Sequence, residues 1–187
     1  MTTTEQRLIQ AAIDQLIAVG YQGATTRSIS ERAGVNEVTL FRRFGSKDEL
    51  LAAAISQVIA PFVGSVADLT GELHRDLELV ARSYVGFVDA NQGLMMRLIA
   101  SAGDQSLGNL ISKFQGEIVA ALRDMVIEHQ GRGELVAGQP EDLLREFMGP
   151  LAVRPIMSHL LEPGPFDAAA YVGRYLDGHG ASPAHYS

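Results

Sequence analysis

Residues 25–47 read TTRSISERAGVNEVTLFRRFGSK, and this stretch decides the fold. Thr25 and Asn36 are residue types that commonly cap helix N-termini, and each precedes a short segment that favours a helix. Gly34 lies between the two segments, where a tight turn needs the positive φ that glycine adopts without strain. Two short helices joined by such a turn have the layout of a helix-turn-helix, whose second helix enters the DNA major groove.

The rest of the chain carries apolar residues at helical spacing and no convincing strand alternation. We expect Gly20 to end the first helix, Ser46 to cap the fourth, and Pro61 to bend or end it. Pro150 and Pro155 are expected to interrupt a later helix. The chain is predicted to be all-α, with about nine helices near residues 3–19, 26–33, 37–43, 47–62, 71–90, 92–102, 105–130, 140–161 and 166–178.

Composition excludes several classes of protein. The 187 residues are 47% hydrophobic and 20% charged, which is typical of a globular chain. The chain has no cysteine, so it has no disulfide framework, and its five histidines lack the spacing of a metal site. No apolar run approaches the ~20 residues of a membrane span, and residues 1–10 are too polar for a signal peptide. A cytoplasmic protein without cofactor, metal or membrane partner is expected.

The net charge of −7 is unevenly distributed. Residues 1–50 carry six basic and six acidic residues, whereas residues 51–187 carry nine basic and sixteen acidic ones. Within residues 25–47, five basic and two acidic residues give a local charge of +3. A local basic surface is what a small DNA-reading module requires, although ordinary charge scatter on a solvated helix is the alternative.

Residues 5–55 resemble the TetR family of bacterial transcription regulators, while the similarity beyond residue 60 is only architectural. The resemblance implies a three-helix helix-turn-helix DNA-binding domain over residues 1–46. It also implies a helical bundle for ligand binding and dimerisation over residues 47–187. The residues that carry it are Ala11-Ala12, Gly20-Tyr21, Ala24-Thr25-Thr26, Ile29, Ala33-Gly34-Val35, Thr39-Leu40-Phe41, Phe44, Ser46-Lys47 and Leu50-Leu51.

The start of the segment 37–43 is expected to meet base edges. An asparagine suits adenine, a glutamate suits cytosine N4, and a valine or a threonine methyl group suits the thymine methyl. Arginines one turn later can reach phosphate or guanine, and a lysine at the start of the next helix lies where a helix N-terminus favours phosphate. The candidate DNA-binding residues are Thr25, Arg27, Asn36, Glu37, Thr39, Phe41, Arg42, Arg43 and Lys47.

Three of these residues depart from the usual family pattern, and some have structural alternatives. Phe41 stands where tyrosine is common, Arg43 where histidine is common, and Glu37 where lysine or arginine is frequent. Phe41 could pack on the sugar-phosphate backbone or on its own module, and Arg42 could form an ion pair within the module. Two neighbouring apolar residues, Leu40 and Phe44, are expected to be core.

The family resemblance implies a homodimer through the last two helices. A dimer would place two reading helices ~34–36 Å apart on a palindromic operator in double-stranded DNA. The alternative is that the apolar residues of these helices complete the core of the monomer. They are Leu143, Leu144, Phe147, Leu151, Ile156, Leu160, Leu161, Phe166, Val172, Tyr175 and Leu176.

Methionines and aromatic residues in the second half could line a pocket for a small apolar effector, since adaptable side chains suit such a site. The alternative is that each is an ordinary core residue. The candidate ligand-binding residues are Tyr84, Phe87, Met96, Arg97, Phe114, Met125, Met148 and Arg154.

The sequence therefore favours a homodimeric, ligand-responsive transcriptional regulator, most simply a repressor that an effector releases from DNA. A helical enzyme or carrier with an accessory helix-turn-helix is a second possibility. The chain lacks the nucleotide-binding and nucleophile motifs that would support this second possibility. A protein-interaction or small-molecule-binding module with an accessory helix-turn-helix is the third.

Overall fold

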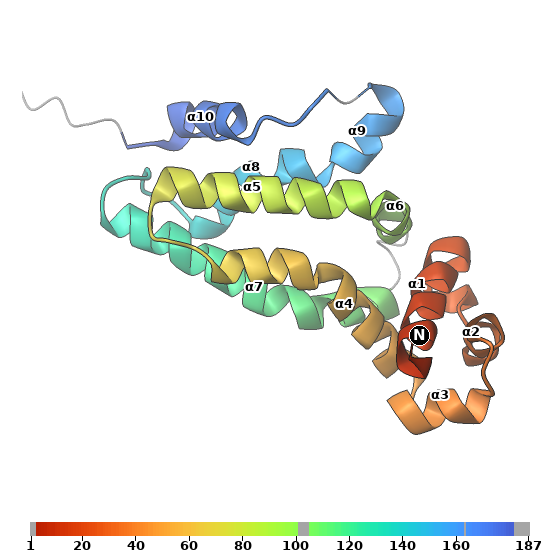
Figure 1. Cartoon of the computed structure of the whole chain (residues 1–187). Helices are drawn as coiled ribbons and strands as arrows, with labels where there is room; N and C mark the ends of the chain where they lie inside the picture. Colours follow the sequence, from red (N-terminus) through yellow and green to blue (C-terminus); the bar gives the residue numbers. More distant parts are fainter. Residues whose placement is uncertain (1–2, 101–104, 163, 182–187) are drawn as a thin grey trace, which may run out of the picture. The chain divides into compact units, whose positions relative to one another are not determined.

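The computed structural model describes residues 3–100, 105–162 and 164–181, without the side chains of 106, 107, 110, 111, 113–115, 117 and 159. The described residues are helical, and an isolated bridge between Leu135 and Gly180 accompanies the helices, so the all-α prediction is confirmed. The helices are α1 Thr4–Gly23, α2 Thr26–Ala33, α3 Glu37–Phe44, α4 Lys47–Ala67, α5 Leu73–Ala90, α6 Gln92–Ala100, α7 Gln105–Gly131, α8 Pro140–Ala152, α9 Arg154–Leu160 and α10 Ala168–His179 (Figure 1).

The chain divides into two compact units. Unit 1 comprises residues 1–60 and 91–115, and unit 2 comprises residues 61–90 and 116–187. The expected domain boundary between residues 46 and 47 lies inside unit 1, because the first part of α4 packs with α1–α3. The division into a DNA-binding and a ligand-binding domain remains a prediction.

Unit 1 is held together by one apolar cluster. α1 contacts both α2 and α6, and α2 contacts α3. The cluster excludes water almost completely, and burial of each large aliphatic side chain contributes about 1.5–3 kcal/mol. Its fully buried large members are Leu8, Leu16, Ile29, Leu40, Leu50 and Leu51.

The end of α1 differs from the prediction. Gly20 leaves helical geometry with φ 75°, yet one more turn follows and α1 reaches Gly23. The Arg97 guanidinium of α6 donates to the carbonyl oxygens of Ile17 (3.0 Å) and Ala18 (2.8 Å), just before this kink. A side chain from α6 therefore satisfies carbonyl groups that the kink leaves without helical partners.

The fourth helix is longer than expected. Pro61, which is expected to bend or end the helix, lies inside α4, which runs to Ala67. It does not end the helix, and a bend there stays a prediction. By length and composition α4 could cross a membrane, which the sequence analysis did not anticipate. Part of this apolar surface is packed, because Leu50 and Leu51 are fully buried in the core of unit 1, although 33% of the apolar stretch is buried in all.

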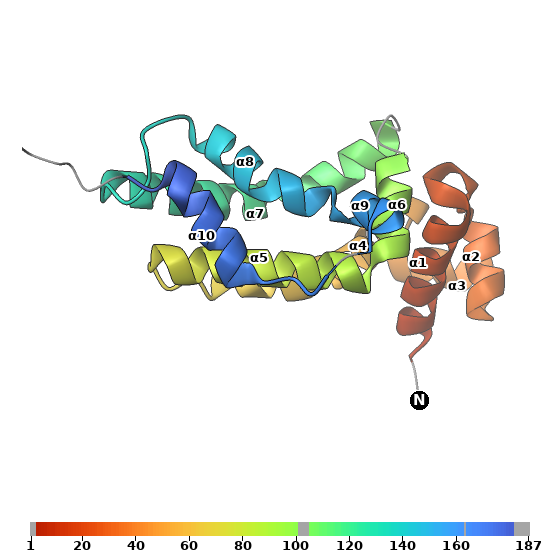
Figure 2. The same cartoon turned by 90° about the horizontal axis from the view of Figure 1, so that it is seen from above.

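Unit 2 packs α5, α8, α9 and α10 together with the second part of α7. α10 lies across α5 (Figures 1 and 2), and α5 also contacts α8 and α9. The predicted helix over 140–161 is two helices, separated at Val153 before Pro155. Phe147 is 1% exposed and packs against the rings of Tyr171 and Tyr175.

Two buried polar side chains of unit 2, Asp76 and His129, have partners that lie close by in the sequence. The fully buried Asp76 carboxylate accepts from the Thr70 amide and hydroxyl and from the Gly71 amide, each at 2.8 Å. The fully buried His129 lies 2.5 Å from a Glu134 carboxylate oxygen through its Nδ1. These contacts pair the Asp76 carboxylate and His129 Nδ1, whose burial alone would be costly, whereas the buried His129 Nε2 has no hydrogen-bond partner among the described residues.

Candidate nucleic-acid interface

The reading module begins with a capped α2. The Thr25 hydroxyl accepts from the Ser28 amide at 3.1 Å, and the Ser28 hydroxyl accepts from the Thr25 amide at 3.1 Å. Gly34 ends the helix in the left-handed region, with φ 64° and ψ 41°. The turn predicted from this glycine is confirmed, and the capping role of Thr25 is explained by this reciprocal pair.

The start of α3 is fixed from two sides. The Asn36 side-chain oxygen caps the helix by accepting from the Val38 amide at 2.9 Å. The Glu37 carboxylate accepts a hydrogen bond from the Thr26 hydroxyl of α2. The acidic residue that departs from the family pattern therefore connects the two helices of the motif.

The burial pattern shows which side of α3 faces solvent. Leu40 is fully buried and Phe44 packs against the core of unit 1, as predicted, whereas Val38 is 63% exposed. Successive residues of a helix are 100° apart, so Val38 and Arg42 lie opposite Leu40. Phe41 is 48% exposed on the flank of α3, so its ring is available to a partner.

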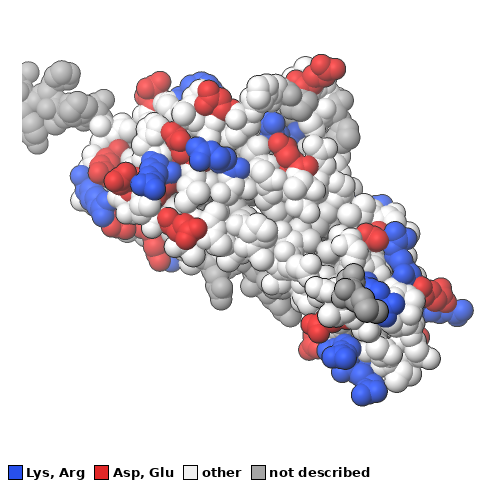
Figure 3. All heavy atoms as spheres, in the orientation of Figure 1, with Lys and Arg blue, Asp and Glu red and all other residues white. Residues whose placement is uncertain are grey.

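A shallow hollow lies on the other flank of α3. Thr39, Arg42 and Arg43 line this hollow, which holds about 310 Å³. Within the described part of the chain, neither arginine forms an ion pair. Figure 3 shows basic groups at the α3 end of unit 1, with acidic groups beside them, and basic and acidic groups also lie next to one another in unit 2.

Arginines of α2 are engaged within the module. Arg27 forms an exposed ion pair with Glu31 at 2.9 Å, and the hydrogen bond to this carboxylate raises the pKa of the Arg27 guanidinium. Arg32 reaches across to Asp14 of α1 at 2.8 Å. The alternative of an ion pair within the module, considered for Arg42, applies to these two arginines instead.

Lys47 is held at the start of α4 by the end of α1. Its ammonium donates to the Tyr21 carbonyl oxygen at 3.1 Å and lies 4.2 Å from the centre of the Tyr21 ring. The Tyr21 hydroxyl donates to Asp48 Oδ1 at 2.6 Å. The predicted cap of α4 is present, because the Ser46 hydroxyl accepts from the Glu49 amide at 3.1 Å.

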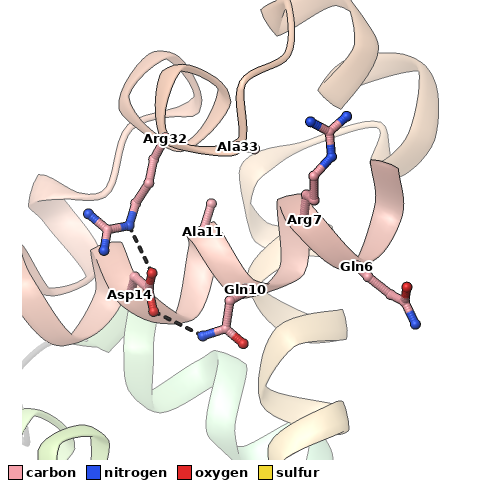
Figure 4. Close-up of a pocket in the computed structure, with 7 residues that line it drawn as sticks. All are labelled: Gln6, Arg7, Gln10, Ala11, Asp14, Arg32 and Ala33. Atoms are coloured by element: carbon pink, nitrogen blue, oxygen red, sulfur yellow. Dashed lines mark hydrogen bonds and ion pairs between the residues drawn. The ribbon is translucent and has the colours of Figure 1, made fainter. Parts of the chain in front are cut away.

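A second hollow, of about 420 Å³, lies between α1 and α2, and the sequence analysis did not predict it. Figure 4 shows Arg32 and Gln10 directed toward Asp14, with Arg7 pointing away from this group. Arg7 lies over the motif's turn, because a Cβ built on Gly34 would be 3.7 Å from its Nη1. Only tertiary contact places Arg7 there, so the residue pattern gave no signal for it.

The candidate ligand-binding residues fall in different places. Tyr84 and Phe87 form an aromatic cluster with Phe62 in unit 2, with ring centres 5.3–6.2 Å apart. Burial raises the pKa of the Tyr84 phenol. Met125 is buried in the core of unit 2 and Met148 packs against it.

The other candidate ligand-binding residues either belong to unit 1 or already have a partner. Met96 and Arg97 belong to unit 1, where the Arg97 guanidinium binds carbonyl oxygens of α1. Arg154 pairs with Asp89 at 3.2 Å and lies 5.6 Å from the centre of the Phe166 ring. The predicted Phe114 side chain lies outside the described residues. Among the described side chains, no cluster of three or more His, Asp or Glu could hold a metal ion.

Eight of the eleven apolar residues predicted for a dimer interface pack in the core of unit 2. Five are buried, namely Leu143, Phe147, Leu151, Val172 and Tyr175, and three are partly buried against them, namely Leu144, Phe166 and Leu176. By contrast, α9 and its flanks expose four large apolar side chains. These are Val153 (44%), Met157 (41%), Leu160 (70%) and Leu161 (70%).

The similarity to known proteins is strongest in the first part of the chain, which belongs to unit 1. Residues 8–54 match the family model for bacterial regulatory proteins of the tetR family. YvkB, an HTH-type transcriptional regulator of Bacillus subtilis, is 40% identical over 78 residues, which are 41% of each chain. The DNA-binding transcriptional repressor TetR of Mycobacteroides abscessus is 28% identical over 94% of this chain and 90% of that protein.

The match to several curated relatives is partial. The chain spans 41% of the length of YvkB and 65% of that of an HTH-type transcriptional regulator of Mycobacterium tuberculosis. Among solved structures, a tetR family transcription regulator from Shewanella sp. PV-4 aligns with a TM-score of 0.74 and 18% identity. It covers 97% of this chain and 100% of that one. A fatty acid metabolism regulator of Clostridium perfringens has the same TM-score and identity, over 91% and 95% of the two chains. At this identity the structures show a shared fold.

Proposed function

Since the chain belongs to the TetR family of helix-turn-helix transcriptional regulators, we propose that it reads an operator by placing the outer face of α3 in the major groove. The main support for this proposal is that Thr39, Arg42 and Arg43 line one hollow. Among the described residues, both arginines lack a carboxylate partner. A groove about 12 Å wide admits this helix, and an unpaired guanidinium suits guanine or phosphate.

The other predicted contacts take distinct roles in this proposal. The oxygen of Asn36 caps α3, which leaves its amide NH₂ to donate to a base. Glu37, oriented by Thr26, is assigned to accept from cytosine N4. The exposed ring of Phe41 packs on sugar-phosphate, and phosphates are assigned to Lys47 and to the start of α2, Thr25 and Arg27.

The functional form in this proposal is a homodimer on a palindromic operator. The exposed apolar side chains of α9 and its flanks support an interface there, because an apolar patch of this kind marks an interaction surface. Two copies would then place their α3 helices ~34–36 Å apart, which is one turn of B-DNA.

A small, largely apolar effector is assigned to unit 2, near the cluster of Phe62, Tyr84 and Phe87. An effector that prefers a bundle state with misaligned reading helices weakens DNA binding by that preference alone. The typical coupling of ~1–3 kcal/mol corresponds to ~5–150-fold in affinity. This makes the chain a repressor released by its effector, acting in the cytoplasm.

The sorting of contacts is tested with two variants on a pool of random duplexes. Thr39→Ala should relax sequence preference, because Thr39 is assigned to a base edge. Lys47→Ala should weaken all sequences about equally and reduce the slope of log affinity against log salt by ~1. Equal behaviour of the two variants would contradict the assigned roles.

A further inference from the structure

The end of α1 and the start of α4 are joined through a single residue, Tyr21. The buried Tyr21 ring lies under the Lys47 ammonium, and its backbone carbonyl oxygen accepts from that ammonium. Its hydroxyl donates to the carboxylate of Asp48, the next residue of the chain. One side chain thus contacts a cation with its ring and the neighbouring anion with its hydroxyl.

We propose that Tyr21 is a positioning residue for DNA binding, which keeps the Lys47 ammonium available to a phosphate by holding the Asp48 carboxylate away from it. This inference rests on the proposed function, in which Lys47 meets the DNA backbone. Tyr21 itself does not contact DNA in this account, and it acts through the two residues it orients.

The ammonium retains donors for a phosphate in this arrangement. Lysine has three N–H donors, and one of them is used by the Tyr21 carbonyl oxygen. The ring holds the ammonium by a cation–π contact, which adds no competing negative charge. The lysine is therefore fixed in place with unused donors, which lowers the entropy lost when it binds a phosphate.

The Asp48 carboxylate is the competing group. It lies in the first turn of α4, directly beside Lys47, where it could either pair with the ammonium or repel a phosphate. The hydrogen bond of 2.6 Å from the Tyr21 hydroxyl ties this carboxylate to the end of α1. Loss of the hydroxyl alone should therefore free Asp48 and impair Lys47.

The conformation of the chain before Tyr21 supports this role. Gly20 adopts φ 75°, so the last turn of α1 is redirected just before Tyr21. Arg97 holds the carbonyl oxygens of Ile17 and Ala18 on the other side of this kink. Tyr21 therefore projects from a turn that directly follows the part of α1 held by Arg97 of α6.

The test is a mutant cycle on a duplex that the wild-type chain recovers from a random pool. Tyr21→Phe keeps the ring and removes only the hydroxyl, and it should weaken binding about threefold. In an Asp48→Asn background the same change should have no measurable effect, because the competing charge is gone. In a Lys47→Met background it should also have no effect, since the residue through which it acts is absent.

A merely structural role predicts a different result. If Tyr21→Phe weakens binding equally in all three backgrounds, or not at all in the wild-type background, the proposal is wrong. Thermal unfolding of each variant confirms that the compared proteins are folded. If the wild-type chain recovers no duplex at low salt, the proposed function fails first and this inference fails with it.

Discussion

Helix α3 and the helices of unit 2 use the same residue types in different ways. On α3, Phe41 is half exposed, and Arg42 and Arg43 have no ion pair within the described residues. In unit 2 the aromatic Phe147 is buried against two tyrosines. Of the seven arginines of unit 2, five form ion pairs with carboxylates, namely Arg82, Arg123, Arg132, Arg145 and Arg154. Most arginines of unit 2 are paired internally, whereas both arginines of α3 have no carboxylate partner among the described residues and lie in the region assigned to an external partner.

The most exposed apolar side chains also differ between the two regions. Val38 on α3, and Leu160 and Leu161 at the end of α9, are the most exposed large apolar side chains of those described. The valine stands among arginines, which suits a charged partner with methyl groups, such as DNA. The leucines stand among other apolar residues, which suits a second copy of the chain.

The sharpest way to break this comparison is to truncate one phenylalanine from each region. Phe147→Ala should lower the free energy of unfolding by about 3–5 kcal/mol, because it leaves a cavity in the core of unit 2. Phe41→Ala should cost less than about 1 kcal/mol, since its ring is already half in water. Denaturant unfolding measures both, and similar losses of stability would contradict the contrast.

The arginines give the next largest effect. Replacing Arg42 and Arg43 together with glutamine should weaken binding to a selected duplex by about 3 kcal/mol, or about 100-fold. The matched control replaces Arg82 and Arg145, which pair with carboxylates in unit 2. Titration of duplex with both proteins compares them, and an equal loss of affinity from the control would show that the unpaired arginines are not special.

The exposed leucines should affect assembly rather than folding. Leu160→Ser with Leu161→Ser should weaken self-association at least about tenfold, because two exposed apolar side chains leave the assigned interface. Sedimentation at several concentrations measures this change. The control is Val19→Ser in unit 1, at a residue 50% exposed. Unchanged self-association of the leucine variant would place the interface elsewhere.

The smallest expected effect concerns alkaline pH. Burial, with a smaller effect of Glu146, raises the pKa of Tyr175 to about 12 from 10.0. The folded state thus favours the neutral phenol, so its contribution is fully present below about pH 10 and is lost as pH rises toward 12. Tyr175→Phe should flatten this loss and cost about 0.5–1.5 kcal/mol near neutral pH, since the hydrogen bond to Leu143 disappears. Denaturant unfolding across alkaline pH measures both effects, and an unchanged pH dependence would show that another group titrates.

The sequence predicted the reading module closely because local rules determine it. Caps at Thr25 and Asn36 and the turn at Gly34 depend on neighbouring residues, and all three are present. What could not be predicted depends on tertiary contacts. The pairing of Lys47 with Tyr21, 26 residues away, is one example. In the second half, periodicity identified the apolar residues of α8 and α10, but it could not say that most of them face inward.

The most direct measurement is selection of bound duplexes from a random pool, followed by binding of the recovered duplex at several salt concentrations. We expect a two-fold symmetric sequence with half-sites one helical turn apart. We also expect an affinity that falls steeply with salt and becomes less salt-dependent when Arg42 and Arg43 are replaced. The claim that α3 reads DNA would be contradicted if no duplex is recovered at low salt. It would also be contradicted if replacing Arg42 and Arg43 leaves the affinity for the duplex unchanged.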